Sequence, residues 1–200
     1  MKMKLSKLVK MAAAIVSLSL ISSSVYAIDW VIDGSNSQLN FVSIKKNKVA
    51  EVHSFKQLQG SYDAQGQFIL EIALASVDTN NPIRDDRMKN YLFEVSQFSS
   101  AKITSNIDTA LVDAIAEGAS KLLTVDASLD LHGMVSPIKL EVIVSRLVGA
   151  KLLVVSAQPV IINAGDFGLT AGITKLMELA KLPSISQAVP ISFYVTLKLK

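Results

Sequence analysis

Apolar and polar residues alternate most clearly at the C-terminal end of the chain, in "ISFYVTLKLK". One face of this stretch is wholly apolar and consists of Ile191, Phe193, Val195, Leu197 and Leu199. The residues between them are serine, tyrosine, threonine and lysine. Because successive side chains of a β-strand point to opposite faces, this period of two predicts a half-buried strand.

The same alternation appears on both sides of "HGMVSP" at 132–137, with apolar residues at every second position of 125–131 and 138–144. This pattern predicts a β-hairpin with "HGMVSP" as its connection. Five more segments have strand character: "SQLNFVSI", "EVHSFKQLQGSYD", "FILEIALASV", "AKITSNI" and "KLLVVSAQPVII". About eight strands with short connections predict an all-β protein, either an antiparallel barrel or a sandwich.

Two segments depart from the strand pattern. "NPIRDDRMKNYLF" begins with a turn-forming Asn-Pro and places Met88 and Leu92 four residues apart, as on one face of a helix. "GITKLMELAKLP" places Ile173, Leu176, Met177 and Ala180 on one helical stripe that stops at Pro183. We expect one or two short helices that lie over the end of the barrel.

The first 27 residues have the character of a secretory signal. Four lysines precede an apolar run at 11–21, and "VYA" at 25–27 has the small-residue spacing of a cleavage site. The run is shorter than the roughly 20 residues that a membrane span requires. We expect cleavage after Ala27, a periplasmic location, one domain over 28–200 and no stable membrane insertion after cleavage.

Removal of the signal changes the charge balance. The full chain has 20 Lys and Arg against 17 Asp and Glu, for a net charge of +3. Residues 1–27 hold four lysines and no acid, so 28–200 has 16 basic residues against 17 acidic ones, a net charge of −1. This balance argues against nucleic acid as a partner. The chain also has no cysteine, which excludes disulfides and thiolate metal sites.

The two histidines are the candidates for catalysis or metal binding. His132 lies on the polar side of its predicted strand, directly before Gly133, which favours an exposed turn residue. His53 also falls on a polar face, and its neighbour Ser54 points the other way, so the two do not form a catalytic pair. No "GxSxG" elbow and no metal-ligand spacing accompanies either histidine. We expect no catalytic residue, no metal and no cofactor.

Two further motifs have unremarkable explanations. "NAGDFGLTAG" carries three glycines but neither a phosphate-loop lysine nor a dinucleotide pattern, so a loop that turns on glycines is expected. "RDDR" at 84–87 mixes both signs of charge within one helical turn, which is typical of a solvated face.

Apolar side chains dominate the composition. Hydrophobic residues make up 50% of the chain and aromatic residues only 6%. The interior of an eight-stranded barrel is either filled by side chains or holds one small ligand. Alternation assigns the following apolar residues to the inward face, as candidate pocket lining: Phe68, Leu70, Leu129, Leu131, Leu140, Val142, Phe193 and Val195.

The order of motifs resembles the YceI family of periplasmic lipocalin-like proteins over nearly the whole of 28–200. The motifs are "IDWVIDGSNSQLNF", "HSFKQLQG", "IRDDRMKNYLFEV", "LDLHGMVSPIKLEV" and "INAGDFGL". The resemblance implies an eight-stranded antiparallel barrel whose elongated apolar pocket binds polyisoprenoids or other long-chain amphiphiles, without catalytic machinery. Two features depart from the family pattern: Ala164-Gly165 replaces an Arg-Ser pair, and 109–121 is longer and more helical. The second feature suggests a reshaped pocket mouth.

The pattern and the resemblance together predict a periplasmic carrier of a long isoprenoid or lipid chain. A hydrolase or isomerase of an apolar substrate, using His132 or His53 with a nearby carboxylate, is the first alternative, and a β-sandwich that acts through its surface around a filled core is the second. The sequence leaves the oligomeric state open, a homodimer included.

Overall fold

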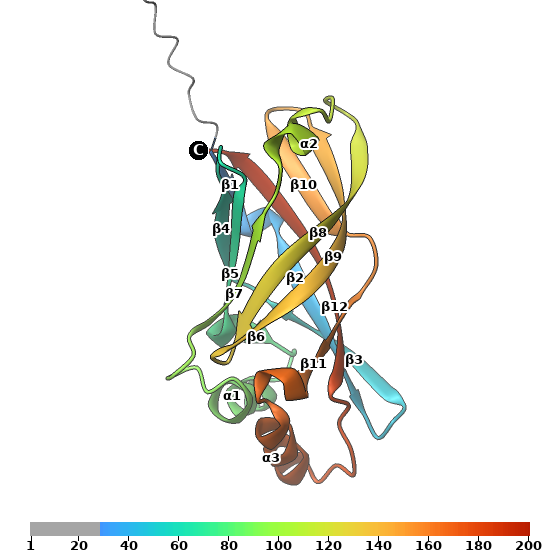
Figure 1. Ribbon diagram of the computed structural model, residues 1–200. Coiled ribbons are helices and arrows are strands. Elements are labelled where there is room, and N and C mark those ends of the chain that lie inside the picture. The colour runs from blue at the N-terminus through green and yellow to red at the C-terminus, as the bar shows by residue number, and fades with distance from the viewer. Residues whose placement is uncertain (1–28) are drawn as a thin grey trace, which may run out of the picture.

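The computed structural model describes residues 29–200, so the predicted signal at 1–27 lies outside the described part (Figure 1). The strands of this part are β1 Trp30–Ile32, β2 Gln38–Lys45, β3 Val49–Phe55, β4 Leu58–Tyr62, β5 Gln67–Ala73, β6 Val77–Asp78, β7 Ser100–Asn106, β8 Ser120–Leu131, β9 Met134–Leu147, β10 Lys151–Ser156, β11 Val160–Asn163 and β12 Ala188–Leu199. The α-helices are α1 Pro82–Arg87, α2 Thr109–Asp113 and α3 Thr170–Ala180. Shorter helical turns are η1 Gly34–Asn36, η2 Leu74–Ser76, η3 Met88–Leu92 and η4 Ala164–Phe167.

The strands close into an antiparallel barrel with eight positions around its wall. The order is β1, β4, β5, β7, β8, β9, β10 and β12, and β1 pairs back onto β12. Further along β12, β2 pairs with β12 on one side and with β3 on the other. β1 and β2 therefore occupy one position in the wall, and β3 and β4 occupy the next. The predicted eight-stranded barrel is confirmed, and the sandwich is not observed.

Two segments that were expected to be single strands are each divided into two. "EVHSFKQLQGSYD" forms β3 and β4, with a break at Lys56 and Gln57, and "KLLVVSAQPVII" forms β10 and β11. Gly60 in β4 shows how closely the strands approach there. A Cβ at this glycine would lie 1.9 Å from the carbonyl oxygen of Ile69 on β5. The alternation of side chains marks faces but does not reveal where a strand bends to close the barrel.

The β8–β9 hairpin turns in two residues, so the expected six-residue connection is wrong. Leu131 already pairs with Met134, and pairing continues through Leu129 and Ser136. His132 and Gly133 form the turn with φ of 54° and 75°. Positive φ at both central positions produces the twist that a tight hairpin needs, and histidine tolerates it better than most residues.

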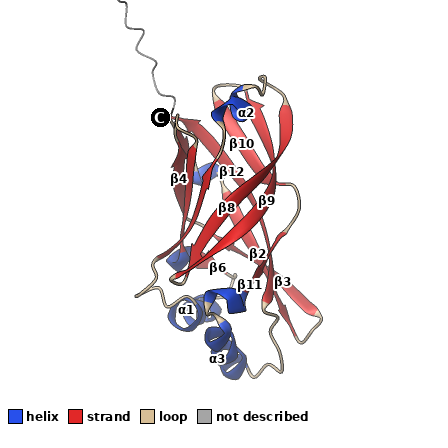
Figure 2. Ribbon diagram, viewed as in Figure 1, coloured by secondary structure: helices blue, strands red, loops and turns tan. Residues whose placement is uncertain are grey.

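Helices cover one end of the barrel, as expected. α1 continues into η3, where Met88 and Leu92 are buried, and α3 buries Ile173 and Leu176. Both lie at the same end of the strands, whereas α2 lies at the opposite end (Figure 2). α3 ends at Ala180, before the expected stop at Pro183, because Lys181 takes a left-handed conformation. The helical character expected over 109–121 is limited to α2.

Candidate ligand-binding cavity

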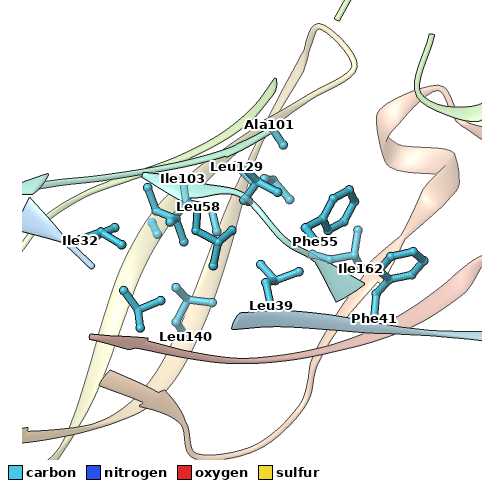
Figure 3. Packing of buried hydrophobic residues seen from close by; sticks show 14 of the residues in the cluster. Ile32, Leu39, Phe41, Phe55, Leu58, Ala101, Ile103, Leu129, Leu140 and Ile162 are labelled. Carbon is cyan, nitrogen blue, oxygen red and sulfur yellow. The ribbon is translucent and has the colours of Figure 1, made fainter. Parts of the chain in front are cut away.

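The barrel interior contains a cavity of about 130 Å³ that we call the middle chamber. Its 21 lining residues are all apolar and come from the barrel wall, from β11, α3 and the turns η2, η3 and η4, and from the residues next to these turns. Leu39 on β2 points across the interior toward Leu129 and Leu140 on the neighbouring strands β8 and β9 (Figure 3). Packed protein interiors have few voids larger than a water molecule, and an apolar void of about 150 Å³ stays dry and binds apolar ligands. This interior is therefore suited to an apolar guest.

A second cavity of about 70 Å³, the inner chamber, adjoins the first and shares Ile103, Leu140 and Phe193 with it. Its wall is apolar apart from Ser105 and the hydroxyl of Tyr62. Burial raises the pKa of Tyr62 to about 12, so the phenol stays neutral. The two chambers together form an elongated apolar path along the barrel.

The segment after β7 lies at the inner end of this path. Val112 of α2 lines the inner chamber and is buried. The Arg146 guanidinium donates hydrogen bonds to the carbonyl oxygens of Ile115 and Val112 and lies 5.8 Å from the centroid of the Trp30 ring. The segment at 109–121 therefore shapes the inner end of the cavity, and not its mouth.

A third cavity of about 440 Å³, the mouth chamber, lies at the helical end and shares Phe41, Leu92, Ile173 and Val189 with the middle chamber. Its polar and charged lining residues are Ser43, Lys45, Glu51, Asn81, Arg84, Arg87 and Ser186. Charged side chains line only this one of the three chambers in the described part of the chain. The cavity path is thus apolar along its length and polar at one end.

All eight residues that the sequence assigned to the pocket lie on the cavity wall. Leu129, Leu131, Leu140 and Phe193 line the middle chamber, and Phe68, Leu70, Val142 and Val195 line the inner one. That any of them contacts a ligand remains a prediction. Sequence reasoning missed the lining from β2 and β3, which includes Leu39, Phe41 and Phe55, although their alternation would have identified it.

An ionic network at the mouth chamber connects α1 with β2 and β3. The Arg84 Nη1 lies 2.6 Å from Glu51 Oε2, and Lys45 Nζ lies 2.8 Å from the same oxygen. Arg84 also donates to Thr79, through Nε to Oγ1 at 3.0 Å and through Nη2 to the carbonyl oxygen at 2.9 Å. The hydrogen bond from Lys45 and the charges of Arg84 and Lys45 lower the pKa of Glu51.

The "RDDR" motif is therefore more than the solvated face that was expected. Besides the contacts of Arg84, the Asp85 carboxylate accepts hydrogen bonds from the backbone and hydroxyl of Thr79, which is buried. Of the four residues, only Asp86 is exposed. Charge pattern along one turn could not show this, because the partners lie on the preceding loop and on β3.

His53 was expected on a polar face, and this prediction is wrong. The side chain is 2% exposed and faces the interior opposite Phe41, with ring centroids 5.1 Å apart. Its Nε2 lies 2.8 Å from Ser43 Oγ, and its Nδ1 has no hydrogen-bond partner among the described residues. Burial, and then the cation of Arg84, lower its pKa and so favour the neutral ring. The Ser43–His53 contact lacks the carboxylate that orients the imidazole of a catalytic triad.

His132 occupies a turn, as expected, but its side chain is only 14% exposed. Its Nε2 lies 2.9 Å from Glu94 Oε2, and its ring centroid lies 4.3 Å from that of Phe98. These contacts tie the β8–β9 turn to the segment that follows η3. The sequence offered no signal for them, because Glu94 is 38 residues away.

The glycine-containing loop is a short helical turn that ends on a glycine. "NAGDFG" forms η4, in which Asn163 caps Gly165 and Gly168 turns the chain with φ of 69°. Ala164 and Phe167 are buried, and Ala164 lines the middle chamber.

Within residues 29–200, no group of three or more His, Cys, Asp or Glu is placed to hold a metal ion. No helix in this range is long and apolar enough to cross a membrane.

A closed antiparallel barrel with an elongated apolar interior and one polar end defines the class of lipocalin-like binding proteins. Within that class, the chain belongs to the family of YceI-like domains, whose pattern matches residues 30–197. The family that the sequence resembled is thereby confirmed.

Two known structures are similar to this chain. A polyisoprenoid binding domain from Saccharophagus degradans, implicated in plant cell wall breakdown, has 39% sequence identity and a TM-score of 0.83, with 86% of this chain and 98% of that chain covered. Burkholderia cenocepacia BcnA has 20% identity and a TM-score of 0.64, with 82% and 98% covered, and shows the shared fold alone. A comparison with curated proteins found no match.

Proposed function

We propose that this protein is a carrier that encloses one long apolar chain, an isoprenoid or a fatty-chain amphiphile, inside its barrel. The observation that carries the proposal is the row of three adjoining chambers whose charged residues are confined to one end. The chain of the ligand lies in the apolar chambers and its polar group in the mouth chamber. The S. degradans domain, at 39% identity, is a polyisoprenoid binding domain, which favours an isoprenoid.

Simple energetics favour a long ligand over a small metabolite. Burial of one CH₂ group contributes roughly 0.8 kcal/mol, so about ten of them give a gross gain of about 8 kcal/mol. Association itself costs an estimated 4–15 kcal/mol. A ligand must therefore bury an extended chain before binding becomes useful, and the elongated cavity suits such a chain.

The carrier acts without catalysis in this proposal. The Ser43–His53 contact is the arrangement closest to a nucleophile with a base, but no described carboxylate orients the imidazole. The proposed chemistry is transfer of an apolar chain out of water, which requires no covalent step.

The test is mass spectrometry of an organic extract of the purified protein. We expect a long-chain compound in a ratio approaching one per protein molecule, which we call the loading. Conversion of that compound over time would favour the hydrolase or isomerase. An extract without any such compound, together with no uptake of added polyprenyl or fatty chains, would leave the surface-acting module.

The proposal places the protein in the periplasm after cleavage of the signal at Ala27. Its support is the lysine-rich start, the short apolar run and "VYA". Intact-mass measurement of protein from the envelope fraction is expected to give a chain that begins at Ile28. A full-length chain held in the membrane fraction would contradict the signal. Gel filtration of the same material would show whether the protein forms a homodimer.

A further inference from the structure

The helical end of the barrel carries an excess of positive charge. Three segments surround the mouth chamber: the end of the β2–β3 hairpin at 45–51, α1 with η3 at 82–92, and α3 with the following loop at 170–186. Together they hold eight lysines and arginines against four aspartates and glutamates. The rest of 28–200 holds eight against thirteen, so these three segments have a net charge of +4 and the remainder −5.

Three of these lysines are exposed and form no ion pair within the described residues. Lys46, Lys48 and Lys181 are exposed, and none of them forms an ion pair within residues 29–200. Lys45 and Arg84, in contrast, share Glu51 at the mouth chamber. Lys46, Lys48 and Lys181 therefore lie outside the ionic network of Lys45, Arg84 and Glu51.

Exposed apolar side chains stand among these lysines. Ile83 in the first turn of α1 is 66% exposed, and Val52 on β3 is 63% exposed. Val49, next to Lys48, is 36% exposed. Cations interleaved with exposed apolar side chains are the pattern that binds the interface of an anionic lipid bilayer.

The segments form one connected rim rather than separate loops. The Lys46 amide donates to the carbonyl oxygen of Ser184 at 3.0 Å, and the Ser184 hydroxyl donates to Asn47 Oδ1 at 3.0 Å. The Ser186 amide donates to the carbonyl oxygen of Ile44 at 2.8 Å. The β2–β3 hairpin projects from the barrel at this end, beside α3 (Figure 1). A flat membrane surface at this end can therefore contact the β2–β3 hairpin, α1 and the loop after α3 together.

We propose that this rim, formed by 45–52, α1 and the loop at 181–186, docks the protein on an anionic lipid bilayer with the mouth chamber facing the lipid. Lys46, Lys48 and Lys181 contact the anionic headgroups, and Ile83 and Val52 enter the interface. A water-insoluble chain then passes between bilayer and barrel without crossing water. This transfer rests on the proposed carrier function, whereas binding of the rim to lipid is testable without knowledge of the natural ligand.

The experiment measures sedimentation of the mature protein with vesicles of phosphatidylcholine, alone or mixed with phosphatidylglycerol. We expect binding to the mixed vesicles that weakens with added salt, because exposed charges are screened. Lys46→Glu with Lys48→Glu is expected to lower the partition constant by about tenfold or more. The matched control, Lys121→Glu with Lys151→Glu, makes the same charge change with exposed lysines of the opposite end and leaves binding within about twofold.

A second pair of variants tests the apolar contacts. Ile83→Ser is expected to weaken vesicle binding, whereas Val148→Ser, at a residue 76% exposed in the β9–β10 turn, leaves it unchanged. The docking proposal is overturned if the parent does not bind the mixed vesicles, or if the paired rim and control variants bind alike. Loading is measured on the same samples. Vesicle binding without loading would contradict the carrier function and support the docking surface. Loading without vesicle binding would contradict the docking surface and support the carrier function.

Discussion

Phe41 and His53 face each other across β2 and β3, and this pair marks the point where the barrel interior changes from apolar to polar. On the inner side of the pair, Leu39 opposes Phe55, and both line the middle chamber. On the outer side, Ser43 opposes Glu51, and both line the mouth chamber. His53 bridges the two environments, because its ring packs on Phe41 while its Nε2 contacts Ser43.

The lowered pKa of His53 predicts a pH-dependent stability. The unfolded chain takes up a proton near the ordinary pKa of 6.5, whereas the folded protein does so only at lower pH. The free energy of unfolding is therefore unaffected above that range and falls as the pH drops below 6.5, by at most about 1.4 kcal/mol per pH unit for one proton. Chemical denaturation between pH 7 and pH 5 measures this slope.

The matched variant for this prediction is His53→Gln, which keeps a polar partner for Ser43 but does not titrate. We expect a shallower slope above pH 5 in the variant. Glu51 and Asp78 do not interfere in this window, because their lowered pKa values place their titration below 4.5 and 3.8. The stability that they contribute is lost only at more acid pH. Equal slopes in parent and variant would show that His53 does not titrate as described.

The two histidines also show how far the sequence could predict the fold and the site. The period of two identified most strands and placed all eight assigned residues on the inward face, because barrel walls repeat inward and outward positions. It left barrel and sandwich open, and the resemblance to the YceI family favoured the barrel. It assigned His53 to the wrong face because a histidine was counted as polar, although its neighbour Phe55 shares its face. The contacts of Arg84 with Glu51, and of His132 with Glu94, join residues distant in sequence, and no local pattern encodes them.

The Arg84–Glu51 pair is expected to stabilise the packing of α1 on the barrel. Arg84→Met should lower the free energy of unfolding by about 1–2 kcal/mol, because the buried Thr79 loses two donors and both charged side chains are partly solvated. Arg84→Lys should not restore the loss, since an ammonium group cannot reproduce the fork. Urea denaturation measures both.

A double-mutant cycle with Glu51→Gln separates the ion pair from the rest of the network. We expect a coupling energy of about 0.5–1 kcal/mol, because Glu51 keeps Lys45 when Arg84 is removed. A coupling energy of zero would mean that the ion pair adds nothing to the hydrogen bonds with Thr79.

Ala101→Leu tests whether the middle chamber is open space. Ala101 is buried and lines this chamber, so the larger side chain enters the volume that a ligand would take. The ligand-free variant should melt at or above the temperature of the parent, while loading falls. In a filled core the same change would cost about 1–3 kcal/mol. Ser100→Leu, at the exposed residue before it, is the control for the added side chain. A clear drop in melting temperature confined to Ala101→Leu would contradict the open chamber.

Val195→Trp tests whether the ligand chain reaches the inner chamber. Val195 is 1% exposed and lines that chamber, so an indole there would exclude the end of a long chain but not a short one. For the parent, affinity for saturated fatty acids should rise with chain length. For the variant it should level off earlier. Exclusion of about three CH₂ groups corresponds to about 2.4 kcal/mol, or roughly fiftyfold in Kd.

The control for this last change is Tyr194→Trp, because Tyr194 is 40% exposed and faces outward, whereas Thr196 on the other side is itself buried and donates to the carbonyl oxygen of Asn36. Titration calorimetry with chains of increasing length gives the comparison. The inner and middle chambers share wall residues. An indole that fills the inner chamber therefore limits how far a chain bound in the middle chamber can extend. If Val195→Trp and the parent show the same dependence on chain length, the bound chain stops in the middle chamber, and Phe68, Leu70, Val142 and Val195 do not belong to its binding site.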